Sequence, residues 1–291
     1  MIFLFGFVPK PDKILRMTAT LDDIYQILLP YQKIIDRSLA CHVWPAGSLG
    51  EAVRYALTNG GKRFRPTIVL MIGRALKSRD LIDAALSIEY FHTASLIADD
   101  LPCMDDDDER RGKPSLHRVY GEGVSLLASY TLISEGYASI ARASDNPVLV
   151  KLALECASFN TLLATEGQHL DLFPTDDSEK TIREALRKKT VSLFEIAFVF
   201  GWIFGGGDIN NLSTVKQAAH HFGMAFQIAD DIADLRQDKN HGVNLAMKVG
   251  AEKAIQILRQ EMESCQYKLE ELNLGDSEVA QLVKTLDLCG L

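Results

Sequence analysis

The sequence has little of what marks the specialised classes of protein. Only 9 of its 291 residues are proline and 5 are cysteine, which excludes collagen and disulfide-stapled miniproteins. Its 47% of hydrophobic residues excludes a disordered chain. Internal repeats, low-complexity tracts and Ser/Pro linkers are absent as well. The chain is long enough to bury one large core or two small ones.

Signals for secretion and membrane insertion are also missing. The five cysteines are scattered without a CxxC pair, which favours a reduced, cytoplasmic protein. Residues 1–8 are apolar but have no basic region before them, and they are too few for the apolar region of a signal sequence followed by a cleavage site. The longest internal apolar run, Leu193–Phe204, contains Glu195 and is too short to cross a bilayer. We therefore expect no membrane span and interpret this run as a core helix.

Positive charge is the scarcer sign, with 31 Lys and Arg against 39 Asp and Glu, a net charge of −8. Because no basic stripe is present, a nucleic-acid partner is not expected. Seven of the acids lie between Asp99 and Glu109, and the remainder is nearly neutral with 31 basic against 32 acidic residues. The acidity is local, and such a dense group of carboxylates indicates that this segment binds cations.

Helical spacing fills the chain between short loops at 59–61, 112–114, 174–178 and 205–208, and strand-like alternation is scarce. This organisation predicts an all-α fold: a single-domain bundle of about ten or more helices. Residues 1–16 are expected to be an N-terminal extension, with Met17 as an alternative start, and residues 17–291 to form the domain.

Two helical stripes end in aspartates. In the first, three- and four-residue steps place five positions on one face, followed by Asp100 and, beyond Pro102, by Asp105: Ala85, Ile88, His92, Ser95 and Asp99. The second stripe has the same steps, with Asp231 beside it: Gly223, Gln227, Asp230 and Asp234. One such motif alone is more often solvated surface than a metal site. Two of them on otherwise apolar faces call for counter-ions, and carboxylate oxygens suit Mg²⁺.

Two basic clusters accompany the acids. Arg110, Arg111 and Lys113 follow the acidic segment, and Lys62, Arg63 and Arg65 follow Gly60-Gly61. Either cluster alone is most simply a salt-bridged loop, but arginine side chains also suit bidentate contact with phosphate. Together with the acids they predict a site for two diphosphate groups, one held by metal and the other by side chains alone.

These residues resemble a known family, the trans-isoprenyl diphosphate synthases or short-chain polyprenyl synthetases. The similarity runs from about Leu49 to Asp234 and rests on five motifs in the expected order: GGKRFRP (60–66), FHTASLIADDLPCMDDDDERRGKPSLH (91–117), EGQHLDL (166–172), KT (189–190) and FQIADDIAD (226–234). The resemblance implies a helical bundle around a central cavity, the isoprenoid synthase fold. It also implies Mg²⁺-dependent, head-to-tail condensation of isopentenyl diphosphate with an allylic diphosphate.

The resemblance also implies a role for each matching residue. Three Mg²⁺ ions would be held on the allylic diphosphate by the two aspartate motifs: Asp99, Asp100 and Asp105, with Asp230, Asp231 and Asp234. The same diphosphate would be contacted by Arg110, Lys189 and Lys239. Isopentenyl diphosphate would be held by Lys62, Arg65, His92 and Arg111, although a plain core histidine is an alternative for His92. Thr190 and Gln227 would lie against the developing allylic cation, and Gln168 and Asp171 would line the cavity.

This sequence departs from the family pattern at several points. Val191 follows the Lys-Thr pair where a glycine is usual, Ala98 precedes Asp99 where histidine is frequent, and the segment after the second motif is short, which weakens the match at Lys239.

Product length is expected to depend on the stripe behind Asp99. Ala94 and Ser95, about one helical turn before it, are small, whereas Phe91 and Tyr90 lie deeper as a lower floor. This pattern predicts geranylgeranyl diphosphate as the product, with farnesyl diphosphate a close second.

Three other functions fit the sequence less well. A terpene cyclase needs no second diphosphate site, a non-catalytic partner subunit would be expected to lose one aspartate motif, and a binding module would not place carboxylates on core faces. The family resemblance further implies a homodimer.

Overall fold

The computed structural model describes residues 11–78, 80–236 and 244–286. In these ranges the chain forms thirteen α-helices, a π-helical turn, a short 3₁₀ turn and one small hairpin. The helices that carry the site are α3 (Phe64–Ala75), α4 (Ile82–Asp99), α7 (Pro147–Leu172), α9 (Ser192–Phe204) and α10 (Leu212–Arg236). The others are α1 (Pro11–Cys41), α2 (Ser48–Thr58), α5 (Leu116–Tyr120), α6 (Glu122–Arg142), α8 (Glu179–Leu186), α11 (Leu245–Val249), α12 (Ala251–Glu271) and α13 (Glu278–Val283). The all-α prediction is confirmed.

The core is built around α9. Eleven of its thirteen residues are buried, which agrees with the interpretation of this apolar run as a core helix. Helices α3, α4, α7 and α10 pack against it. Phe194 and Phe198 both contact Phe222 of α10, with ring centroids 5.1 and 5.4 Å apart. Aromatic packing of this kind fixes the spacing of the helices on which the site depends.

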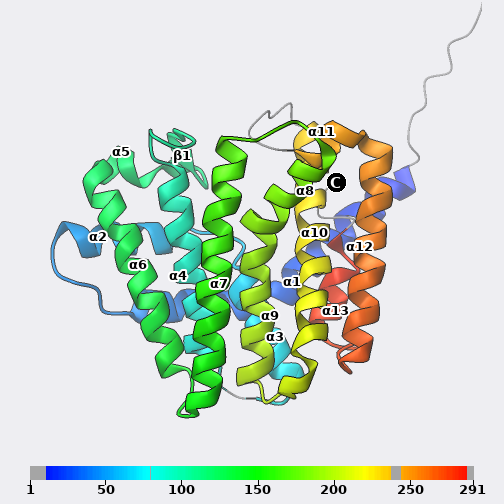
Figure 1. The fold of residues 1–291 in the computed structure, drawn as a ribbon, viewed down its shortest axis with the longest axis horizontal. Coiled ribbons are helices and arrows are strands. Elements are labelled where there is room, and N and C mark those ends of the chain that lie inside the picture. The colour runs from blue at the N-terminus through cyan, green and yellow to red at the C-terminus, as the bar shows by residue number, and fades with distance from the viewer. Residues whose placement is uncertain (1–10, 79, 237–243, 287–291) are drawn as a thin grey trace, which may run out of the picture.

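The C-terminal ends of α4 and α10 lie at the same end of the bundle, the end that carries β1 and α11 (Figure 1). Each of the two aspartate motifs therefore finishes its helix at this end. The π-helical turn η1 (Arg187–Val191), which joins α8 to α9, packs against both α7 and α10. The fold thus gathers four of the sequence motifs at one end of the bundle.

The hairpin was not foreseen in the sequence. Strands β1 (Glu109–Arg110) and β2 (Lys113–Pro114) pair antiparallel, with Glu109 opposite Pro114. The turn between them is Arg111-Gly112, at φ 57° and 75°. Two successive positive φ angles are what a tight two-residue hairpin requires, and Gly112 was the signal for it in the sequence.

The expected start of the domain lies within the first helix. Helix α1 begins at Pro11 and continues through Met17, so the expected boundary at residue 17 falls inside a helix and stays a prediction.

Helix α7 is long and apolar enough to cross a membrane, with a mean hydropathy of 1.4 over its most apolar window, of which 22% is buried. Length and composition alone are weak grounds for a span, because core and interface helices pass the same test.

Candidate active site

The aspartates of the first motif lie in two different environments. Asp99 ends α4, and its backbone carbonyl accepts a 2.9 Å hydrogen bond from the Asp105 amide, which holds the two residues together. Asp100 is 3% exposed and accepts hydrogen bonds from Arg110, one of them at 2.8 Å from Nε. Arg110 also donates to Asp107 at 2.8 Å. Among the described residues, Asp99 and Asp105 therefore have carboxylates without a hydrogen bond or ion pair, whereas Asp100 is held by Arg110 of the hairpin.

The second motif likewise has one buried aspartate and two that are partly exposed. Asp231 is 2% exposed, accepts a 2.7 Å hydrogen bond from the Leu245 amide and so joins α10 to α11. Asp230 and Asp234 are partly exposed and lie four residues apart, one turn of the same helix. Each Asp-Asp pair thus supplies one buried anchor and one open carboxylate.

Burial raises the pKa of the open acids, and nearby lysines only partly oppose the rise. The pKa of Asp99 rises to about 7, mainly through burial, and nearby Lys189 opposes the rise. Burial raises the pKa of Asp105 as well, and that of Asp230 to about 6, with Lys62 opposing the latter. Carboxyl groups with such pKa values are poorly solvated as anions, so a bound cation would relieve them.

Lys189 lies between the acids. Its Nζ forms an ion pair with Asp171 Oδ2, and its charge acts on both Asp99 and Asp105. The π-helical turn carries Lys189 to this position, and α7 makes room for it at Gly167, where an added Cβ would lie 2.2 Å from the Lys189 amide nitrogen. π-Helical turns frequently occur at functional sites. Val191, the departure from the family pattern, is buried against Gly223 of α10.

A chain of hydrogen bonds crosses from η1 to α10. Thr190 Oγ1 donates to Gln227 Oε1 at 2.8 Å, and Gln227 Nε2 donates to Asp231 Oδ1 at 3.0 Å. Because both ends of the Gln227 amide are engaged, its orientation is fixed. The structure thereby brings together the two residues predicted to lie against the allylic cation.

A separate basic cluster lies on α3 and α4. Arg65 Nη1 is 3.3 Å from His92 Nε2, and the Arg65 guanidinium lies 4.6 Å from the centre of the Phe194 ring. Burial and then the charges of Arg65 and Arg111 hold the pKa of His92 well below its usual value, so its imidazole is neutral and accepts from Arg65. Burial lowers the pKa of Arg65 to about 10. A guanidinium held in this way is poised to bind an anion.

The hairpin brings Arg111 to the same cluster. Its Nη1 donates to the carbonyl of Gly60, and its guanidinium lies against Gly61, where an added Cβ would be 2.6 Å from Cζ. Among the described residues, neither Arg65 nor Arg111 forms an ion pair with a carboxylate. The two arginines predicted to hold isopentenyl diphosphate therefore converge from distant parts of the chain.

The sequence grouped Arg63 with the anion-binding residues, and this interpretation is wrong. Its side chain is 2% exposed and pairs with Glu89 and Asp36, while also donating to the carbonyl of Leu57. Arg63 is the N-cap residue of α3, with a left-handed backbone at φ 53°. Arg63 is therefore a structural cation. The family resemblance assigned only Arg65 to isopentenyl diphosphate, whereas charge alone did not separate the two arginines.

Three further residues belong to the predicted site: Gln168, Lys62 and Lys239. Gln168 is 7% exposed, and neither its Oε1 nor its Nε2 has a partner among the described residues, which suits a position lining a ligand cavity. Lys62 is exposed, and Lys239 lies outside the described residues.

The residues expected to set product length lie on different faces of α4. Ser95 is partly exposed on the stripe of His92 and Asp99, whereas Ala94 is 1% exposed and its carbonyl accepts from Ser129 Oγ of α6 at 3.0 Å. Phe91 is buried against Gly136, with its ring 5.0 Å from that of Tyr137. Tyr90 instead packs against His42 and Trp44, with ring centroids 5.9 and 5.6 Å apart. Of these residues, Ser95 is the one that is partly exposed on the same face as Asp99.

A helical bundle with two carboxylate motifs and a separate arginine cluster at one end is the arrangement expected of an enzyme that binds metal ions and anionic groups. Comparison with known proteins gives the family. The Polyprenyl synthetase family profile matches residues 47–264. The chain is 34% identical to a trans-prenyltransferase of African swine fever virus, over 79% of this chain and 73% of the relative. It is 31% identical to the heterodimeric geranylgeranyl pyrophosphate synthase large subunit 1 of Arabidopsis thaliana, over 78% and 66%.

Solved structures agree with this assignment. A geranyltranstransferase from Thermotoga maritima superposes with a TM-score of 0.77 at 31% identity, covering 94% of this chain and 98% of the other. An isoprenoid synthase family member from Thermotoga neapolitana has the same TM-score at 34% identity, covering 88% and 98%. The chain belongs to the polyprenyl synthetase family, the trans-isoprenyl diphosphate synthases, and is a short-chain prenyltransferase.

Proposed function

We propose that this prenyltransferase condenses isopentenyl diphosphate with an allylic diphosphate in a Mg²⁺-dependent reaction, and that its main product is geranylgeranyl diphosphate. The observation that carries the proposal is the separation of two kinds of anion site. Asp99 and Asp105 lie near Lys189, and Asp230 lies one helical turn from Asp234, so these open acids form one kind of site. Arg65 and Arg111 form the other, without an ion pair to a carboxylate among the described residues. One diphosphate requires metal in such an arrangement, and the other does not.

The donor set fits Mg²⁺. Asp99, Asp105, Asp230 and Asp234 offer only oxygen ligands, and burial raises the pKa of the first three even though lysine side chains lie nearby. Mg²⁺ prefers one or two carboxylates together with phosphate oxygens, and when bound it supplies charge neutralisation for the leaving diphosphate. We propose that three Mg²⁺ ions bind, as the family implies. The open acids would be their ligands, and Asp100 and Asp231 would hold the neighbouring elements in place.

The side chains account for the remaining chemistry. Lys189 and Arg110 neutralise the allylic diphosphate as its C–O bond breaks. The fixed Gln227 oxygen and Thr190 lie against the carbocation, while apolar walls exclude the water that would quench it. The double bond of isopentenyl diphosphate, held by Arg65 and Arg111, attacks that cation, and a proton is then lost to the departed diphosphate. The neutral His92 positions Arg65 and need not act as a base.

Product analysis tests the proposal. Purified protein receives labelled isopentenyl diphosphate with dimethylallyl, geranyl or farnesyl diphosphate, with and without Mg²⁺, and chain length is measured after phosphatase treatment. Metal-dependent extension to twenty carbons is expected. A stop at fifteen carbons makes farnesyl diphosphate the product and leaves the mechanism intact. No extension with any primer favours a non-catalytic partner subunit, and a cyclic hydrocarbon favours a terpene cyclase.

Replacing Ser95 with phenylalanine is expected to shorten the main product by at least one isoprene unit. Ser95 lies on the stripe of Asp99, so an aromatic ring there enters the path of the growing chain. Chain length after phosphatase treatment measures the effect, and Ser95→Ala, which adds no volume, should leave the product unchanged. An unaltered product distribution in Ser95→Phe would place the floor elsewhere, for example at Phe91.

Replacing Gly61 with alanine is expected to raise the KM for isopentenyl diphosphate roughly tenfold or more, because a misplaced binding group is costly. The new methyl group would occupy the position of the Arg111 guanidinium. Gly60→Ala is the matched control: its φ of 84° imposes similar backbone strain, but nothing lies within 4 Å of the added Cβ. Steady-state kinetics for both substrates separate the two variants. Equal effects of both on KM would mean that strain, and not Arg111, is responsible.

We further propose a homodimer formed through α6 and α7. These helices pack together and expose a group of large apolar side chains: Leu126, Leu127, Tyr130, Ile133, Val148, Phe159 and Leu162. Exposed apolar patches of this kind mark interaction surfaces. The same patch explains why α7 is apolar enough to resemble a membrane span. Relatives named as heterodimeric subunits make a different partner chain the alternative.

Combining Leu127→Glu with Leu162→Glu is expected to convert the dimer to a monomer. Both side chains are more than half exposed, so the charges are solvated in the monomer but would be buried at an interface. Sedimentation equilibrium measures the mass. Tyr267→Glu on α12, which is equally exposed, serves as the control and should remain dimeric. A wild-type protein that is monomeric at all concentrations would refute the proposed homodimer.

A reduced cytoplasmic location is also proposed. It is supported by the free thiols of the four described cysteines: Cys41, Cys103, Cys156 and Cys265.

A further inference from the structure

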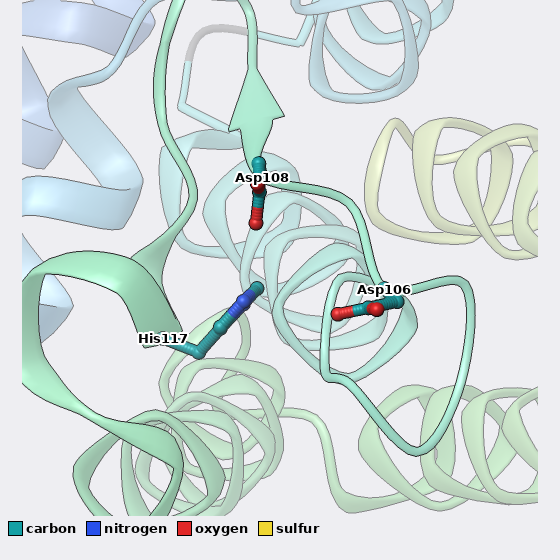
Figure 2. A group of neighbouring side chains, drawn as sticks. All are labelled: Asp106, Asp108 and His117. Atoms are coloured by element: carbon teal, nitrogen blue, oxygen red, sulfur yellow. The ribbon is translucent and has the colours of Figure 1, made fainter.

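A second group of metal-ligating side chains lies beside the hairpin. Asp106, Asp108 and His117 each offer one ligand atom, and the three atoms lie within 4.8 Å of one another. Asp106 belongs to the loop after α4, Asp108 immediately precedes β1, and His117 is in α5. Figure 2 shows the three side chains pointing toward a common space.

His117 is the strongest sign of a ligand. The residue is 8% exposed, and its Nδ1 lies 3.2 Å from Ser115 Oγ. Its Nε2 is buried and has no hydrogen-bond partner among the described residues. A buried polar atom without a partner is unfavourable, so it calls for a ligand. A histidine with one ring nitrogen held by a hydrogen bond and the other free is also arranged as a metal ligand usually is.

The two aspartates are separate from the acids of the active site. The intervening Asp107 forms an ion pair with Arg110 at 2.8 Å, whereas Asp106 and Asp108 turn toward His117. Asp108 Oδ1 is 3.1 Å from Arg118 Nε, which leaves its second carboxylate oxygen for another partner. Asp106 and Asp108 are both exposed, so a cation can reach them from solvent.

We propose that Asp106, Asp108 and His117 bind one first-row transition-metal cation, with Zn²⁺ as the representative ion and water completing its coordination. Three protein ligands and one water form a common zinc arrangement. An imidazole ligand favours Zn²⁺ or Co²⁺, whereas the all-oxygen set around Asp99 suits Mg²⁺. The cation would tie the loop before the hairpin to α5 and so brace the hairpin that carries Arg110 and Arg111. The site does not depend on the proposed prenyl transfer.

Metal binding in excess Mg²⁺ tests this proposal. Full-length protein is stripped of metal, saturated with Mg²⁺ and titrated with Co²⁺ alone, whose visible absorption reports a nitrogen-containing site. One Co²⁺ per chain is expected. His117→Asn and Asp108→Asn should each weaken its binding roughly tenfold or more, since even outer-shell changes have effects of that size. Asp145→Asn removes the same charge from an exposed loop residue and should bind Co²⁺ like the wild type.

A second readout covers the risk that a variant fails to fold. His117 is buried, so the helical content of His117→Asn is checked by circular dichroism, and the exposed Asp108 carries the test if that variant is unfolded. Zn²⁺ should also slow hydrogen exchange at the amides of residues 104–110 in the wild type and not in Asp108→Asn. Equal Co²⁺ affinity in wild type and Asp108→Asn, or no Co²⁺ bound in excess Mg²⁺, would overturn the proposal.

Discussion

Replacing Asp99 with asparagine is expected to lower kcat/KM for condensation by about 10³-fold, with helical content unchanged. A metal that neutralises a leaving diphosphate supplies several kcal/mol, and about 4 kcal/mol corresponds to this factor. Asp99 is the open carboxylate of its pair and, with Asp105, faces Lys189. Asp145→Asn, on an exposed loop, removes the same charge and should retain full activity. Activity near the wild-type level in Asp99→Asn would refute the metal assignment.

The same variant should change how stability depends on pH in the metal-free protein. The folded-state pKa of Asp99 is about 7, above its ordinary value of 3.8, so the folded state retains this proton over a range in which the unfolded state has lost it. Stability therefore falls as pH rises from about 4 to about 7. Asp99→Asn removes this contribution, and thermal unfolding across that range should show a shallower decline. An unchanged pH profile would mean that Asp99 is well solvated in the folded state.

The sequence predicted the fold and the positions of the open acids because both follow from helical periodicity. Apolar residues at three- and four-residue steps place α4, α9 and α10 in the core, and the same steps place Asp99 and Asp230 at the ends of buried stripes. Any helix with that pattern must present those residues to one face. The assignment needs no knowledge of neighbouring elements.

The division of each Asp-Asp pair could not be predicted from the sequence. Successive residues on a helix point about 100° apart, so two adjacent aspartates cannot lie on the same face of the helix. The face is chosen by partners from elsewhere: Arg110 of the hairpin takes Asp100, and the Leu245 amide takes Asp231. Such contacts are tertiary, and neither aspartate carries a local signal that distinguishes it from its neighbour.

Arg63 and Arg65 show the same limit at a basic motif. They are two residues apart in one short sequence, yet Arg63 adopts a positive φ and pairs with the buried Glu89, whereas Arg65 lies in the helix beside His92. Residue type alone gave both the same interpretation. Arg63 has a left-handed backbone, which non-glycine residues seldom adopt, and residue type gives no signal of it.

This difference yields opposite predictions for the two arginines. Arg65→Met is expected to lower kcat/KM for isopentenyl diphosphate by roughly 10² or more, since loss of one partner of a desolvated charge pair costs about 2–5 kcal/mol. The KM for the allylic substrate should change little. Arg65 has no carboxylate ion pair among the described residues, and its Nε is buried without a partner. Removing this unpaired cation should therefore leave the unfolding free energy unchanged or increase it.

Arg63→Met should have the reverse profile, because it leaves the carboxylate of Glu89, which is 1% exposed, without its partner. Loss of one member of a buried ion pair costs about 3–5 kcal/mol of stability, so chemical denaturation should show a large shift in midpoint. Substrate affinity in the fraction that remains folded should be close to that of the wild type. If Arg65→Met instead unfolds as readily as Arg63→Met and still binds isopentenyl diphosphate normally, both arginines are structural. The metal-free diphosphate site would then have to be built on Arg111 and Lys62.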